Sequence, residues 1–362
     1  MRFILTATAI LALVSMLTAF VMQGGLARKR RQADGFWKRF WWRQVLLLPL
    51  YLFVLLPALM GCAGSWMVQT RGDEAKYQGP ILQNDVWVLQ DRRTLRQAMP
   101  AGQTQAAITI PSGNGPTLQG YFVASRQPVP AASVILLHGL FRSAMEVEPV
   151  AEMFRDLGAE VLLLNLRNHG GSESRAFTFG LREKSDLLAA VEYLRKRPQG
   201  LSAPLVVYGV SMGAVVAARA APEIPELAGL VLDAPMADLT STIHRQLGTM
   251  EWENRQGLGL PGFYINLILF WMELASGFSA TDVRPLDQIA QLSEDVHTLF
   301  IGAGRDVRVP PPVVTQMFEA HQAADTHKAM WIEPDSNHGR VWDAQPGQYR
   351  SQLEAFLDRV TR

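Results

Sequence analysis

Short apolar runs, polar turns and amphipathic stretches alternate along the chain between residues 86 and 362. The runs predict strands at Val86–Gln90, Ala107–Ile110, Leu118–Val123, Val134–Leu137, Val161–Leu166, Leu205–Tyr208, Leu230–Leu232, Leu299–Ile301 and Met330–Ile332. Helical patterns lie between most of the later runs, at residues 144–157, 181–197, 212–221, 312–321 and 348–360. This alternation favours a doubly wound, mostly parallel α/β sheet that is flanked by helices, with early antiparallel strands at its edge.

The connection over residues 237–286 is too long for a simple turn between two strands. It contains a very apolar stretch at residues 263–274, which has aromatic and aliphatic side chains and glycines near its start. We expect a helical cap insertion over the carboxyl ends of the strands, where such sheets bind ligands, and an apolar wall of this kind favours an acyl or aromatic group. The glycine-flanked helix could also swing as a lid. The alternative is ordinary packing against the rest of the domain.

Two uncharged apolar segments precede the predicted domain, at Phe3–Met22 and Val45–Met60. Between them, residues 28–43 carry seven basic side chains and a single acidic one. The first segment is long enough to span a bilayer. As two transmembrane helices, the segments would place the basic stretch in the cytoplasm and the domain outside it.

The second segment ends at Leu59-Met-Gly-Cys62, which is similar to the lipobox of bacterial lipoproteins, and Cys62 is the single cysteine in the chain. A basic stretch, an apolar core and small residues before Cys62 fit a cleavable signal that extends from about Leu26 to Cys62, within the membrane or signal region of residues 1–62. The segment Phe3–Met22 is then either a true first helix or an extension from a misplaced start codon. We favour this interpretation, in which Cys62 carries a lipid and residues 63–85 form a linker. Ala63 then implies transport to the outer membrane, by resemblance to the bacterial sorting rule. Both interpretations tether the protein to a membrane in the bacterial envelope.

Composition narrows the function classes. The chain is 48% hydrophobic and 19% charged with a formal net charge of +1, so no charged field indicates a nucleic acid as partner. The motifs that commonly hold metal ions or nucleotides are missing from the sequence, and we therefore expect no cofactor and no metal site. The sequence does not indicate an oligomeric state.

A Gly-x-Ser-x-Gly motif with Ser211 at its centre follows the predicted strand at residues 205–208 and precedes a helical pattern. This is the layout of a nucleophile elbow, which holds a serine hydroxyl at the top of a sheet. Gly209 and Gly213 suit the tight turn because they have no Cβ. The backbone N–H of Met212, at the start of the helix, can bind a developing oxyanion.

An elbow serine needs a base and an acid, which in this type of enzyme follow Ser211 in the chain. Asp306 lies in a glycine-rich loop after a predicted strand, and His338 lies in the loop after the last one. Asp233 ends a strand as well and is the rival acid. Asp335 is close to His338 in sequence, and we interpret it as a solvated loop carboxylate.

The other histidines receive structural interpretations. His138 lies before the nucleophile in the chain, so we expect it to shape a loop and not to act as the base. His244, His321 and His327 fall on helical or helix-end positions and are expected at the surface. His297 is expected at the edge of a strand.

Taken together, these motifs resemble the α/β-hydrolase superfamily over about residues 86–362, in the branch of monoacylglycerol lipases and serine aminopeptidases. His138-Gly139-Leu140 resembles the loop after strand three of that family, which implies that the N–H of Leu140 joins that of Met212 in the oxyanion hole. Asn165 to Ser172 is similar to a family signature after strand four, with Asn165 and Asn168 in place of its usual Asp and Gly. We interpret this segment as structural.

The resemblance and the residues predict a membrane-tethered serine hydrolase that cleaves small-molecule acyl esters through an acyl-enzyme. Ser211 is the expected nucleophile, His338 the base and Asp306 its orienting acid. Two alternatives stay open. The same groups can cleave the amide bond of a peptide-like substrate, and a hydrolase fold can also serve as a non-catalytic envelope protein.

Overall fold

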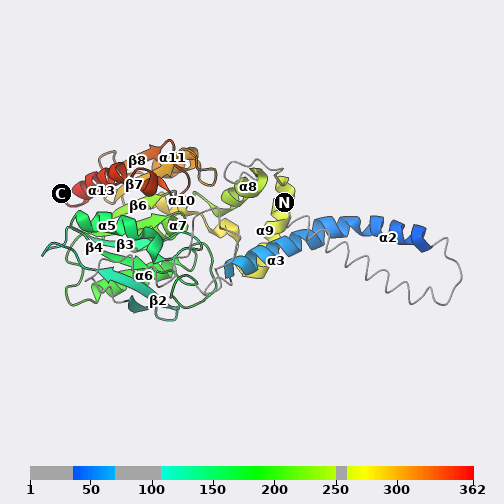
Figure 1. Ribbon diagram of the computed structural model, residues 1–362, viewed down its shortest axis with the longest axis horizontal. Coiled ribbons are helices and arrows are strands. Elements are labelled where there is room, and N and C mark those ends of the chain that lie inside the picture. The colour runs from blue at the N-terminus through cyan, green and yellow to red at the C-terminus, as the bar shows by residue number, and fades with distance from the viewer. Residues whose placement is uncertain (1–35, 70–106, 250–258) are drawn as a thin grey trace. The chain divides into compact units, whose positions relative to one another are not determined.

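The computed structural model describes residues 36–69, 107–249 and 259–362 of the chain. These divide into two compact units (Figure 1). The smaller unit combines the N-terminal helical segment up to Ser65 with residues 261–277, and the larger unit contains the remaining described residues. The predicted segment Phe3–Met22 and the predicted strand Val86–Gln90 lie outside the described residues.

The larger unit is built on an eight-stranded sheet with the order β1-β2-β4-β3-β5-β6-β7-β8. Its strands are β1 (Ala107–Pro111), β2 (Thr117–Val123), β3 (Ser133–Leu137), β4 (Glu160–Leu164), β5 (Leu205–Val210), β6 (Leu227–Asp233), β7 (His297–Ala303) and β8 (Lys328–Glu333). The β1–β2 and β2–β4 pairs are antiparallel, and all later pairs are parallel. The mostly parallel sheet with an antiparallel edge is therefore confirmed, as are eight predicted strands.

The central strands are buried on both faces, so they are continuous apolar runs and do not alternate with polar residues. Helices α5 (Glu148–Asp156) and α13 (Pro346–Val360) cover one face, where Phe154 and Phe356 join the core cluster of the sheet. The opposite layer contains α6 (Lys184–Arg195), α7 (Met212–Ala220), α10 (Pro285–Ile289) and α11 (Pro311–Ala320). Figure 1 shows these layers on the two sides of the sheet.

An apolar helical segment begins at Phe36 and ends at Gln69, and its residues up to Ser65 belong to the smaller unit. It comprises α2 (Phe36–Leu50), a single π-helical turn η1 (Tyr51–Leu55) and α3 (Leu56–Gln69). Cys62 lies inside α3 and is exposed, so the helix continues past the predicted lipid site into the expected linker. The part Trp41–Trp66 is the one helix among the described residues that is long and apolar enough to cross a membrane by itself.

Residues between β6 and β7, where we expected a cap, are largely helical. They form α8 (Leu239–Thr249), α9 (Gly262–Ser276), the short turn η6 (Ala280–Asp282) and α10. Residues 250–258 lie outside the described residues. Helix α9 ends at Ser276. The next residue, Gly277, adopts the left-handed conformation common after a helix C-terminus, and α9 and Gly277 both belong to the smaller unit.

Candidate active site

Ser211 occupies a sharp turn between β5 and α7. Its backbone has φ 53° and ψ −112°, a conformation that costs energy for any residue other than glycine. A hydrogen bond of 2.8 Å from its N–H to the carbonyl of Asp233 fixes the turn. A Cβ on Gly209 would lie 2.3 Å from the carbonyl oxygen of Gly213, so the turn closes only with glycine there. The local geometry is that of the predicted elbow.

Three predicted residues form one hydrogen-bonded chain, although each comes from a different loop. His338 Nε2 lies 2.8 Å from Ser211 Oγ, and His338 Nδ1 lies 2.6 Å from Asp306 Oδ2. An ionised carboxylate only accepts hydrogen bonds, so Nδ1 carries the proton and Nε2 accepts from the serine hydroxyl. The arrangement can therefore deprotonate Ser211 and hold the resulting imidazolium beside a carboxylate.

Asp306 is held in place by its own loop. Its other oxygen, Oδ1, accepts backbone hydrogen bonds from Arg308 at 2.8 Å and from Val309 at 2.9 Å. Its side chain is fully buried, whereas the ring of His338 is 16% exposed. The acid is thus shielded and rigid, while the edge of the base can be reached from outside.

The loop after β3 is fixed by side chains on both sides of Leu140. Gly139 N–H donates to Glu146 Oε2 at 2.6 Å, and Phe141 N–H donates to His169 Nε2 at 3.1 Å. Phe141 has a positive φ of 64°, which turns the chain sharply at this point. The N–H of Leu140 lies between these two anchored amides.

Met212 is the first residue of α7, so its N–H belongs to the helix terminus that has no acceptor within the helix. Its side chain is 1% exposed, and the two glycines beside the elbow allow close approach of the neighbouring backbone.

The rings of His138 and His169 form hydrogen bonds with backbone atoms of the loops after β3 and β4. His138 Nδ1 lies 2.7 Å from the carbonyl oxygen of Gly139, and its Nε2 accepts the N–H of Leu166 at 3.2 Å. Burial, assisted by the nearby His169, lowers the pKa of His138 to about 3, so this ring stays neutral. Its two nitrogens are both engaged, as the sequence led us to expect for a loop-shaping residue.

Asp233, the rival acid, lies at the end of β6 and takes part in a different network. Its Oδ2 accepts a 2.8 Å hydrogen bond from the hydroxyl of Tyr349, which is 3.0 Å from the hydroxyl of Tyr208. Burial raises the pKa of Asp233 to about 7. The carboxyl that contacts His338 belongs to Asp306, and the side chain of Asp233 instead ties β6 to α13.

Two further interpretations from the sequence concern Asp335, in the loop before His338, and His321, at the end of α11. Asp335 is exposed and pairs with Arg305 at 2.6 Å, as expected for a solvated carboxylate. The expectation that His321 lies at the surface is wrong, because it is fully buried. Its Nδ1 is 3.1 Å from the hydroxyl of Thr298, and its Nε2 is 3.2 Å from the carbonyl of Ser293. The end of α11 is thus tied to β7.

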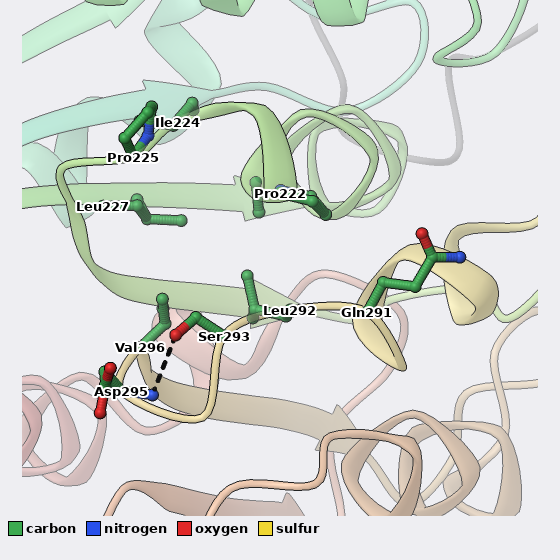
Figure 2. A pocket seen from close by; sticks show the side chains of 10 residues that line it. Pro222, Ile224, Pro225, Leu227, Gln291, Leu292, Ser293, Asp295 and Val296 are labelled. Carbon is green, nitrogen blue, oxygen red and sulfur yellow. Dashed lines mark hydrogen bonds between the residues drawn. The ribbon is translucent and has the colours of Figure 1, made fainter.

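A pocket of about 320 Å³ opens at the amino ends of β6 and β7 (Figure 2). Leu227, Leu292 and Val296 line it together with Ser293, whose hydroxyl accepts the N–H of Asp295 at 3.3 Å. Ser211, Asp306 and His338 follow the carboxyl ends of their strands. The pocket is therefore at the other end of the sheet and is separate from the hydrogen-bonded chain.

Sequence reasoning missed Glu146 and Tyr349, and it did not foresee the contact made by His169. Glu146 lies in the short helix η4 (Ala144–Val147), where no motif marks it, and burial raises the pKa of its carboxyl. His169 belongs to the segment that we interpreted as structural. The histidine in that family signature was the one sequence feature that could have indicated its hydrogen bond to Phe141. The helical pattern of α13 predicts Tyr349 only as a core residue, and it gives no indication of the hydrogen bond from its hydroxyl to Asp233.

Known proteins that are similar to this chain include hydrolases. The family model described as serine aminopeptidase, S33, matches residues 128–265. The uncharacterized protein YqkD of Bacillus subtilis is 28% identical over 261 residues, which is 71% of this chain and 80% of that protein.

Among solved structures, the esterase Pf2001 of Pyrococcus furiosus has a TM-score of 0.57 at 24% identity, over 71% of this chain and 93% of its own. Est1E of Butyrivibrio proteoclasticus, solved with bound ferulic acid, has a TM-score of 0.54 at 17% identity, over 71% of this chain and 100% of its own. The described part of residues 107–362 therefore has the α/β-hydrolase fold, and the matches support a hydrolase of the α/β-hydrolase superfamily.

Proposed function

We propose that the protein is a membrane-tethered serine hydrolase that cleaves carboxylic esters through an acyl-enzyme. The observation that carries the proposal is the chain of two hydrogen bonds from Ser211 through His338 to Asp306. A strained serine, an imidazole with its tautomer fixed and a buried carboxylate are the parts that nucleophilic acyl transfer requires.

The reaction follows from this geometry. Ser211 Oγ attacks the ester carbonyl carbon while its proton passes to His338 Nε2, and the carbonyl oxygen becomes an oxyanion. The N–H groups of Met212 and Leu140 stabilise that oxyanion, each by about 3–4 kcal/mol by analogy with measured donors. His338 then protonates the departing alcohol oxygen. Water, deprotonated by the same nitrogen, attacks the acyl-enzyme, and the returning proton restores the serine hydroxyl as the acid leaves.

The membrane tether is supported by the helix Trp41–Trp66 and by the basic stretch at residues 28–43, which lies at its N-terminal end. Basic residues favour the cytoplasmic side, so the hydrolase unit lies on the outer side of the membrane. Whether the anchor is this helix or a lipid on Cys62, the hydrolase is held at a membrane surface. We also propose that residues 237–286 act as the cap, since three of their helices interrupt the chain between β6 and β7.

The experiment that tests the catalytic proposal uses the full chain in detergent and a fluorophosphonate probe, which reacts with activated serines. We expect the probe to label the wild type, and Ser211→Ala to abolish labelling and to lower ester turnover on the order of 10⁴-fold or more. Ser174→Ala, which removes a hydroxyl that binds Asn168, is the matched control and keeps the label. A folded wild type that no serine probe labels would contradict the proposal and favour the non-catalytic alternative.

A second candidate, an aminopeptidase or amidase, is favoured by the family description that matches residues 128–265. The same nucleophile and oxyanion donors cleave amides, so the two candidates differ in the substrate and not in the chemistry. Rates on amino-acid arylamides and on p-nitrophenyl esters separate them. A higher kcat/KM for esters supports the first proposal, and a higher value for arylamides with a free amino group supports the second.

A further inference from the structure

Helices α3 and α9 pack together at Gly61, at a distance that admits no side chain. A Cβ built on Gly61 would lie 2.5 Å from the carbonyl oxygen of Ile268 and 2.7 Å from the amide nitrogen of Met272. Figure 1 shows α9 beside α3. Small residues that let two helix backbones approach this closely are typical of helix pairs within membranes.

Helix α9 is apolar on the side away from this contact as well. Ile265, Ile268 and Leu269 are buried, whereas the opposite side exposes 57% of Phe270 and 66% of Leu274. Phe263 is 58% exposed, although its ring lies 6.2 Å from that of Phe53 in η1. Glu273 is the only charged residue in the helix. A surface helix of a water-soluble protein has a polar outer face, and a helix that is apolar all round lies in a core or in lipid.

The partner helix has the same character. No charged residue occurs between Val45 and Trp66, and only 17% of the apolar window is buried. Exposed tryptophans lie near its two ends, with Trp42 61% exposed and Trp66 68% exposed. At a rise of about 1.5 Å per residue these rings are about 36 Å apart along the axis, which places both at the interfaces of a hydrocarbon core about 30 Å thick.

We propose that α9 is inserted in the lipid bilayer beside the N-terminal helix, with Phe263, Phe270 and Leu274 in contact with acyl chains. The spacing of the tryptophans favours a bilayer over a protein partner as the occupant of this surface, because aromatic belts mark the two edges of a membrane. With 15 residues, α9 is about 22 Å long, so it enters the bilayer without crossing it.

The inference rests on the membrane tether proposed above and not on the reactivity of Ser211. It also chooses between the two forms of tether. Cleavage before Cys62 would remove Gly61 and the helix N-terminal to it, which would leave the packed face of α9 without this partner. The mature protein therefore retains the residues before Cys62, and lipid contact extends to a segment inserted between β6 and β7.

Spin-label accessibility tests the insertion. The full chain with Cys62→Ser is reconstituted in vesicles of phosphatidylcholine and phosphatidylglycerol, and a nitroxide is attached at Phe270→Cys or, independently, at Leu274→Cys. The matched control is Val129→Cys, at an apolar residue of the larger unit that is 73% exposed. We expect the ratio of oxygen to nickel-chelate accessibility to be several-fold higher on α9 than at Val129, because oxygen concentrates in lipid and the chelate stays in water.

Equal nickel accessibility at the three sites overturns the proposal, and so does shielding of both α9 sites from both reagents, which indicates a protein partner. Fluorophosphonate labelling of the same samples reports the proposed catalytic function separately, so the two failures are distinguishable. The intact mass of protein extracted from membranes provides the second measurement. A chain that retains the residues before Cys62 supports the helix pair, and a lipid-modified chain that begins at Cys62 overturns it.

Discussion

The backbone N–H of Gly139 donates a 2.6 Å hydrogen bond to Oε2 of Glu146. The carboxyl group of Glu146 is buried and lies seven residues further along the chain. Arg142 lies 3.5 Å from the other oxygen of the same carboxylate. Glu146 therefore holds the loop that presents Leu140, the second proposed oxyanion donor, without belonging to the reacting groups.

Removal of this anchor should affect the transition state more than substrate binding. We expect Glu146→Ala to lower kcat on the order of 10²-fold with little change in KM, because a displaced oxyanion donor loses stabilisation specific to the transition state. Glu146→Gln retains an acceptor for Gly139 and should restore most of the rate. Steady-state kinetics on a soluble ester measure the difference, with the exposed Glu354→Ala as control. Equal loss in the Ala and Gln variants would argue against the anchoring role.

The proposed orienting acid can be separated from its rivals by isosteric changes. Asp306→Asn keeps an oxygen for the N–H groups of Arg308 and Val309, so its amide group points at His338 and enforces the wrong tautomer. By analogy with the same change in a serine protease, we expect kcat to fall about 10⁴-fold. Asp335→Asn removes only an exposed pair with Arg305 and should leave the rate within about twofold, since exposed ion pairs contribute little. A large loss of kcat in Asp335→Asn, with little loss in Asp306→Asn, would identify Asp335 as the acid that orients His338.

Asp233 should make stability depend on pH. Its folded pKa of about 7 lies above the ordinary value of 3.8, so the folded state holds the proton more tightly than the unfolded chain does. The stabilisation is complete below about pH 4 and is lost as the pH rises towards 7, at about 1.4 kcal/mol for each unit between the two pKa values. Asp233→Asn cannot ionise and should lack this loss.

Thermal unfolding of the full chain in detergent, followed by near-ultraviolet circular dichroism at pH 5 and pH 8, measures the effect. The Tm of the wild type should fall relative to that of Asp233→Asn between the two values. Parallel pH dependence in both proteins would show that Asp233 is already ionised in the fold. Tyr349→Phe, which removes the 2.8 Å hydrogen bond to the carboxyl, should lower the Tm at both values.

Gly61 and Gly64 form a matched pair for the contact between α3 and α9. Both lie in α3, and each should gain up to about 1 kcal/mol of helix propensity on replacement by alanine. A Cβ on Gly64 meets no atom within 4 Å, whereas on Gly61 it meets the backbone of α9 at 2.5 Å. We expect Gly61→Ala to destabilise the pair by about 1–3 kcal/mol through overpacking and Gly64→Ala to be neutral or slightly stabilising. Protease susceptibility of α9 in reconstituted vesicles reports the difference, and equal susceptibility would indicate that the helices separate in lipid.

The sequence determined the sheet and the loops that carry Ser211, Asp306 and His338. Fully buried parallel strands must be continuous apolar runs, and a serine elbow requires small residues at fixed spacing, so both features can be read locally. The chain order of nucleophile, acid and base then limited the choice to a few side chains. The geometry favours Asp306 over Asp233 because of a hydrogen bond to a residue 32 positions away.

Only the tertiary structure revealed the contacts of Glu146, His169 and Gly61. Glu146 and His169 anchor a loop by accepting hydrogen bonds from backbone N–H groups. Because nearly every residue has such a group, the sequence pattern does not indicate which N–H a side chain will bind. From the sequence, Gly61 is interpreted as one of the small residues of a signal sequence. In the structure it lies close to the backbone of α9, about 200 positions further along the chain. Such contacts depend on how the chain returns upon itself, which local periodicity does not encode.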